Sequence, residues 1–138
     1  MTIDELLERA RGRIFRLTPV ETLEAAGDGA VIVDTRSDGD RERDGVVPGS
    51  VHVPRSVLEW RLAPTSTWRN THVDAERRVI VMCAEGYSSS LAAATLVDLG
   101  LDAGDVVGGF DAWRAAGLPV IPRPPNDAGE RPGTGPPA

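Results

Sequence analysis

Two short runs of apolar residues, at positions 31–33 and 79–82, constrain the fold of this chain more than any other feature. Both runs are continuous rather than alternating, and both consist mainly of valine and isoleucine. A strand with this pattern has two buried faces, which is typical of parallel sheets covered by helices on both sides. The pattern therefore predicts an α/β fold around a parallel sheet.

Helix and strand signals alternate along the rest of the chain, as this fold class requires. Capping residues, prolines and terminal glycines predict helices over residues 2–12, 18–26, 56–61, 88–99 and 110–116. Further short strands are predicted at residues 50–54 and 105–107. Residues 37–45 are predicted to form a polar loop, and residues 63–76 an irregular segment with one short helical piece.

The length of 138 residues fits one compact domain, which we place at residues 1–121. From residue 122 onward, nine of the 17 residues are proline or glycine. Because such a composition cannot form a packed core, we expect residues 122–138 to be a disordered tail.

Charge and composition exclude several functions. The net charge of −6 argues against a protein that binds nucleic acid or an anionic membrane, since both need a basic face. All fifteen basic residues are arginine, so Schiff-base chemistry on lysine and the Gly-Lys-Ser/Thr phosphate loop are excluded. The polar start and the absence of a long apolar run predict a soluble, cytoplasmic protein without a membrane span.

Cys83 is the single cysteine of the chain, so it forms no internal disulfide, and with two separated histidines it cannot complete a structural zinc site. It follows a predicted buried strand directly and precedes a short loop and a helix that Ser88 or Ser89 can cap. A thiol at this junction faces helix N–H groups, which lower its pKa, and Gly86 allows the loop a positive φ. A buried inert thiol is the alternative, but the combination favours a functional cysteine.

The loop resembles the six-residue active-site loop of the rhodanese family, with cysteine first and glycine fourth. It consists of Cys83, Ala84, Glu85, Gly86, Tyr87 and Ser88. Segments 33–36, 45–54 and 107–113, the last together with 117–120, also match the family in the correct order, and the resemblance runs from about Phe15 to Val120.

This resemblance implies a rhodanese-like fold, with a five-stranded parallel sheet flanked by helices on both faces. It also implies a sulfurtransferase in which Cys83 carries a persulfide. The donor would be thiosulfate or a thiol persulfide, and the acceptor cyanide, a thiol or a protein. No metal or organic cofactor is implied.

Two features of the loop bear on this function. It lacks an arginine or lysine and contains Glu85, whose negative charge is expected to weaken the use of thiosulfate. Related cysteine phosphatases place an arginine six residues after the cysteine, where this chain has Ser89, so phosphatase activity is disfavoured. A non-catalytic module that binds a partner or senses sulfur or redox state remains the alternative.

Four other residues are candidates for supporting roles. Asp34 and Arg36 follow the strand at 31–33, where a structural salt bridge or loop anchor is favoured over direct contact with substrate. The resemblance places Arg55 and Arg61 near the mouth of the pocket, where either could offset the charge of Glu85.

Overall fold

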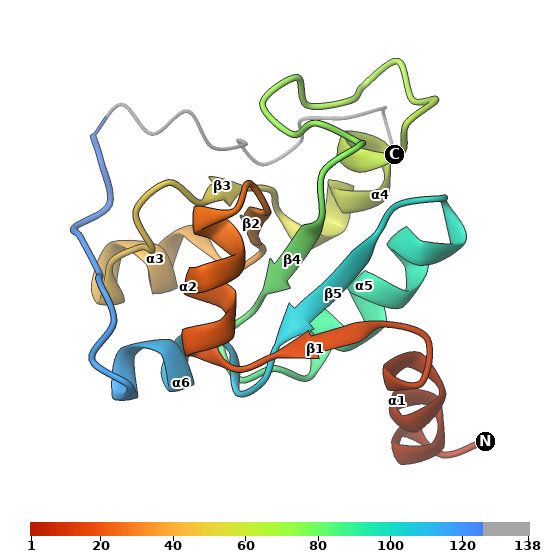
Figure 1. Ribbon diagram of the computed structural model, residues 1–138, viewed down its shortest axis with the longest axis horizontal. Helices are drawn as coiled ribbons and strands as arrows, with labels where there is room; N and C mark the ends of the chain where they lie inside the picture. The colour runs from red at the N-terminus through yellow and green to blue at the C-terminus, as the bar shows by residue number, and fades with distance from the viewer. Residues whose placement is uncertain (126–138) are drawn as a thin grey trace.

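Five parallel strands form the central sheet of the computed structural model, which describes residues 1–125 (Figure 1). The strand order is β1-β5-β4-β2-β3. The strands are β1 (Phe15–Leu17), β2 (Val31–Asp34), β3 (Val51–His52), β4 (Val79–Met82) and β5 (Ala103–Val106). The predicted α/β fold with a five-stranded parallel sheet is confirmed.

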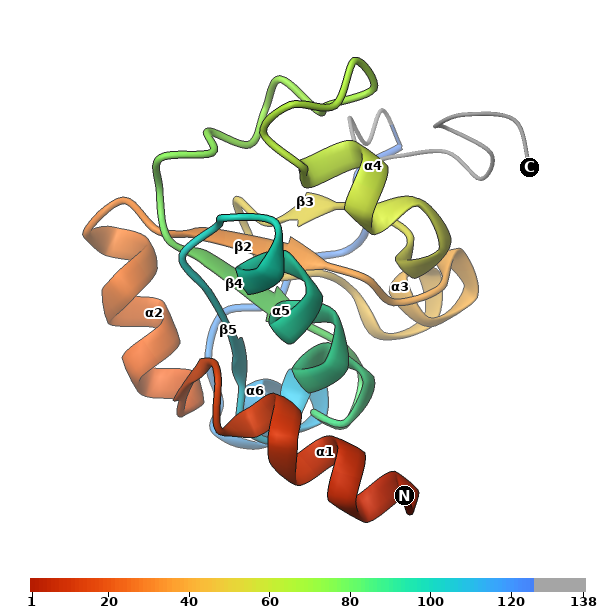
Figure 2. The same ribbon diagram turned by 90° about the vertical axis from the view of Figure 1, so that its right-hand side faces the viewer.

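Helices cover both faces of this sheet (Figure 2). On one face α5 (Ser88–Asp98) packs against β4 and β5, and α1 (Ile3–Arg11) and α4 (Leu58–Leu62) pack against α5. On the other face lie α2 (Pro19–Gly27) and α6 (Gly109–Ala115). The remaining helices are α3 (Asp38–Asp44) and the 3-10 turn η1 (Arg55–Val57).

The two faces explain the continuous apolar runs of β2 and β4. Val33 and Val81 join a cluster with Leu58 and Leu96 from the helices of one face. Ile32, Ile80 and Met82 join a second cluster with Phe110 and Trp113. Because successive side chains of a strand point to opposite faces, every position of the runs at 31–33 and 79–82 packs in an apolar cluster, and apolar residues are required there.

The prediction of a loop at residues 37–45 is wrong, because residues 38–44 form α3. The Ser37 hydroxyl caps this helix by accepting a hydrogen bond from the N–H of Asp40. Acidic residues lie in its first turn and arginines in its last, which suits the helix dipole. One of these arginines, Arg41, is buried 3.4 Å from Asp34. The polar composition resembled a loop, but a buried ion pair fixes the segment as a helix.

Other differences concern short elements. The sequence pattern did not locate β1, whose three half-buried residues are too few to show a period. Strand β5 begins at Ala103 rather than residue 105, and β3 is confined to two residues. The helix predicted from Ser56 begins as the 3-10 turn η1, and residues 63–76 contain turns but no helical piece.

The end of the described chain packs against the domain. Ile121 pairs with Val46 in an antiparallel bridge. Arg123, within the predicted tail, lies 3.4 Å from the Asp38 carboxylate of α3. The rest of that predicted tail, residues 126–138, lies outside the described residues. Within residues 1–125, no helix has the length and apolarity that a membrane span requires.

Candidate active site

Cys83 lies at the carboxyl edge of the sheet, where β4 passes into α5. The residue is 7% exposed, and it lines an open hollow of about 250 Å³. The hollow, called here the thiol hollow, is lined by Cys83, Ala84, Glu85, Tyr87 and Ser88. Five of the six predicted loop residues therefore line one concave site around the sulfur, and Gly86 lies buried beneath it.

The start of α6 holds two carbonyl groups of this loop. The N–H of Phe110 donates to the Cys83 carbonyl at 2.8 Å, and the N–H of Asp111 donates to the Ala84 carbonyl at 3.0 Å. A Cβ atom on Gly109 would lie 2.4 Å from the Cys83 carbonyl oxygen, so only glycine permits this approach. Because each peptide group is planar and trans, the next N–H groups, of Ala84 and Glu85, point away from α6.

Gly86 brings its backbone amide to the sulfur. Its φ of 86° lies in the left-handed region, and its N–H donates to Cys83 Sγ at 3.1 Å. A Cβ atom at this position would lie 2.7 Å from the backbone nitrogen of Gly108. The predicted role of Gly86 in shaping the loop is thus compatible with both its φ and its close packing.

The pKa of the Cys83 thiol reflects two opposed effects. Burial raises the pKa, but hydrogen bonds from the hydroxyls of Ser89 and Ser88 and from the N–H groups of Ser89 and Gly86 lower it. The net effect is a pKa below the usual value for cysteine. The Ser89 hydroxyl also lies 2.8 Å from Asp105, and its single proton serves one acceptor at a time. The backbone N–H groups and the Ser88 hydroxyl are therefore the donors to the thiolate for which Asp105 does not compete.

The prediction that Ser88 or Ser89 caps α5 is wrong. Tyr87 occupies the N-cap position, and no side chain caps the helix there. The hydroxyls of Ser89 and Ser90 instead donate to the buried Asp105 carboxylate, at 2.8 and 2.7 Å. The first N–H groups of α5 are thus left to stabilise negative charge in the thiol hollow.

Asp34 and Arg36 form a buried ion pair near this site. The Arg36 guanidinium donates to both carboxylate oxygens of Asp34, at 3.1 and 2.9 Å, and to the Gly45 carbonyl at 2.9 Å. It also lies 3.6 Å from the centre of the Phe110 ring. Through these contacts Arg36 connects β2, the end of α3 and the start of α6, which holds the loop.

Arg55 and Arg61 do not line the thiol hollow. Arg55 forms an ion pair with Glu59 one helical turn later, at 2.9 Å. Arg61 donates to the Trp68 carbonyl. Within residues 1–125, no hydrogen bond or ion pair joins either arginine to Glu85, which is exposed at the edge of the hollow.

Sequence analysis did not single out Arg11, Arg16 or Asp105, all of which contact the loop or its helix. Arg11 and Arg16 both donate to the Gly86 carbonyl, at 2.8 and 3.1 Å. Asp105 is fully buried in β5, opposite Arg16 in the register of β1. The signal in the sequence was Asp105, a carboxylate beside the apolar residues of a predicted strand. A buried charge requires a partner, so its position indicated a nearby arginine.

Comparison with known proteins agrees with this geometry. A family model for the rhodanese-like domain matches residues 18–116. The chain is 35% identical over 103 residues to a protein named thiosulfate sulfurtransferase GlpE from Pseudomonas savastanoi, covering 73% of this chain and 89% of that protein.

Two solved structures are similar in fold. A Rhodopseudomonas palustris protein of unknown function, described as a possible tyrosine phosphatase, has a TM-score of 0.80 and 36% identity, covering 88% of this chain and 95% of that one. A thiosulfate sulfurtransferase from Pseudomonas aeruginosa has a TM-score of 0.67 and 26% identity, covering 85% of this chain and 22% of that one.

Proposed function

Since this chain belongs to the rhodanese-like domain family, we propose that it is a sulfurtransferase in which Cys83 carries sulfur as a persulfide. The observation that carries the proposal is the position of Cys83 Sγ in the thiol hollow, 3.1 Å from the Gly86 amide and at the start of α5. This environment favours a thiolate, which is the nucleophilic form of cysteine.

The reaction proceeds in two displacements. In the first, the Cys83 thiolate attacks the outer sulfur of thiosulfate, a sulfur–sulfur bond forms, and sulfite leaves with the electron pair of the broken bond. In the second, cyanide or a thiolate attacks the terminal sulfur of the persulfide. Thiocyanate or a new persulfide leaves, and the Cys83 thiolate is restored. The loop amides stabilise the negative terminal sulfur between the two steps.

The size of the thiol hollow supports small donors and acceptors. A space of about 250 Å³ suits thiosulfate or the sulfur end of a thiol persulfide, whose remainder extends outward from the open side. The Pseudomonas savastanoi relative is named for thiosulfate, which supports this ion as one donor. A protein persulfide or thiol is a further partner that the open hollow admits. The proposed steps use no metal or organic cofactor.

The Rhodopseudomonas palustris protein raises phosphatase activity as a second function. Hydrolysis of a phosphate ester needs cations that clamp the transferred dianion, most often a bidentate arginine. In this chain the residue six positions after Cys83 is Ser89, which is buried and bonded to Asp105. The only charge on residues 83–89 is the carboxylate of Glu85. Sulfur transfer therefore fits the loop better.

The proposal is tested by intact mass. Incubation with thiosulfate or a thiol persulfide is expected to add one sulfur atom to the chain, and cyanide is expected to remove it with release of thiocyanate. Multiple turnovers would support an enzyme. Slow loading without turnover would instead favour a sensing module, and failure to load from either donor would overturn the proposal. Hydrolysis of p-nitrophenyl phosphate, measured in parallel, is expected to be absent.

The charge of Glu85 gives a prediction about the donor. Changing Glu85→Gln is expected to raise kcat/KM for thiosulfate about fivefold at low salt, because a carboxylate at the edge of the hollow repels a dianion. A neutral thiol persulfide should gain less, and added salt should reduce the difference. Steady-state kinetics with both donors measures this.

The matched control is Glu76→Gln, which removes the same charge from an exposed residue just before β4, at the opposite edge of the sheet. It should leave both donors unaffected. If Glu85→Gln changes the two donors equally, or changes neither, the carboxylate does not act on the donor's charge.

A further inference from the structure

Two arginines from the N-terminal segment donate hydrogen bonds to the loop that follows Cys83. Arg11, the last residue of α1, donates to the Gly86 carbonyl at 2.8 Å, and Arg16, in β1, donates to the same oxygen at 3.1 Å. Both residues precede position 18, where the match to the family model begins. The segment outside the matched region therefore contacts the loop directly.

Further contacts fix both arginines. The Nε of Arg16 donates to Asp105 Oδ1 at 2.8 Å, while Asp105 Oδ2 accepts from Ser89 and Ser90 in the first turn of α5. The Nε of Arg11 donates to the Ser90 hydroxyl at 3.1 Å. Arg11, Arg16 and Asp105 thus form one connected group, called here the arginine clamp, between β1, β5 and the loop.

The clamp restrains Gly86, the residue whose N–H contacts the sulfur. The peptide group between Gly86 and Tyr87 is planar, so holding the Gly86 carbonyl directs the Tyr87 N–H away from the arginines. It also restrains Gly86, whose own N–H lies 3.1 Å from Cys83 Sγ. The Arg11 guanidinium lies 5.6 Å from the centre of the Tyr87 ring, which adds a second restraint on the loop.

The clamp also supplies net positive charge, because two guanidinium groups face one carboxylate. On the other side of the loop, the arginines form ion pairs with carboxylates that are at least as numerous: Arg36 and Arg41 share Asp34, Arg41 also approaches Asp38, Arg43 lies near Asp40 and Asp44, and Arg114 lies near Asp44 and Asp111. Glu85 is the remaining charge there, and it disfavours a thiolate. Of these two groups of charges within residues 1–125, the clamp is the one in which arginines outnumber carboxylates.

We propose that Arg11 and Arg16 are positioning residues for Cys83. Through the Gly86 carbonyl they hold the Gly86 amide at the sulfur, and their net charge favours the thiolate and the anionic persulfide. The proposal rests on the proposed function for its effect on sulfur transfer, whereas its effect on the thiol exists with or without that activity.

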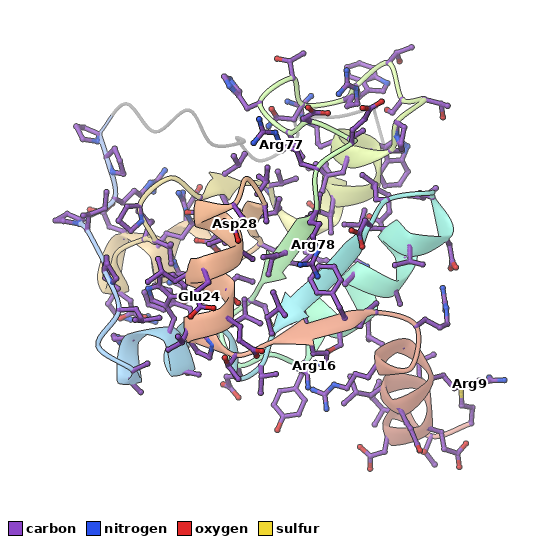
Figure 3. The ribbon with its side chains drawn as sticks, in the orientation of Figure 1. Arg9, Arg16, Glu24, Asp28, Arg77 and Arg78 are labelled. Carbon is purple, nitrogen blue, oxygen red and sulfur yellow. The ribbon has the colours of Figure 1, made fainter. Side chains whose placement is uncertain are left out.

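The test compares Arg11→Gln with Arg9→Gln, which removes the same charge from the same helix. Arg9 is exposed, contacts the Met1 sulfur, and points away from the body of the molecule, whereas Arg16 lies along β1 (Figure 3). Arg11 is preferred to Arg16 for substitution because removing Arg16 would leave the buried Asp105 without its ion-pair partner. Circular dichroism and thermal unfolding establish that each variant is folded.

The rate of Cys83 alkylation by iodoacetamide is measured against pH. Arg11→Gln is expected to raise the thiol pKa and to slow alkylation at neutral pH about three- to tenfold, while Arg9→Gln follows the unchanged protein. Arg11→Lys keeps the charge but not both hydrogen bonds, and should restore part of the rate. Identical pH profiles for Arg11→Gln and Arg9→Gln would overturn the proposal.

Sulfur loading is measured on the same proteins, so the two proposals fail separately. If the unchanged protein takes up no sulfur but the alkylation profile of Arg11→Gln is shifted, the clamp stands and the proposed function does not. If the protein loads sulfur and the profiles coincide, the function stands and the clamp is rejected. Support for both requires that Arg11→Gln also lowers kcat/KM for thiosulfate.

Discussion

Replacing Cys83 by serine is expected to abolish sulfur loading and to lower turnover by more than about a thousandfold. A serine hydroxyl in this site stays protonated at neutral pH and forms no persulfide, since the reaction requires a nucleophilic sulfur. Cys83 is the only cysteine of the chain, so no second thiol can replace it. Intact mass after incubation with thiosulfate, together with thiocyanate production, measures the effect.

Serine closely matches cysteine in size, so the fold should survive this change. Thermal unfolding of Cys83→Ser, and of Cys83→Ala as a second variant, checks that the lost activity is not lost structure. Sulfur added reversibly to either variant would contradict the assignment of Cys83 as the nucleophile, because the sulfur would then reside on another group.

The second large effect is expected at Gly86. Gly86→Ala should destabilise the protein by about 2–4 kcal/mol, combining the cost of a positive φ for alanine with a close contact. The added Cβ would lie 2.7 Å from the Gly108 nitrogen and 3.1 Å from the Val106 carbonyl oxygen, both of which are backbone atoms that cannot turn aside. Urea unfolding measures the loss of stability.

The same change should lower activity in the fraction that remains folded, by at least about tenfold, because moving the Gly86 amide removes a donor from the thiolate. Gly49→Ala is the matched control, since Gly49 has a similar φ of 80° but no atom within 4 Å of an added Cβ. It should cost about 1–2 kcal/mol and leave activity per folded molecule unchanged. Equal losses of stability in the two variants would show that φ alone, and not packing against Gly108, restricts position 86.

Local features of the sequence predicted the two central strands of the sheet and the position of Cys83. The apolar runs at 31–33 and 79–82 specify buried strands because each side chain must pack on one of two helical faces. Cys83 follows one of these strands, so the strand itself places the thiol at the carboxyl edge. Gly86 was identified from the loop pattern because its requirement for a positive φ is a property of a single residue.

Tertiary structure decided where the charged residues act. Helix α3 was mistaken for a loop because its buried Arg41 is stabilised by Asp34 on another element. Asp34 and Arg36 form a buried pair, while Arg55 and Arg61 pair away from the thiol hollow. Arg11 reaches the Gly86 carbonyl from 75 residues earlier in the chain. Composition and local pattern cannot predict such contacts, because a long charged side chain binds whichever partner the register of the strands and the packing of the helices bring within its reach.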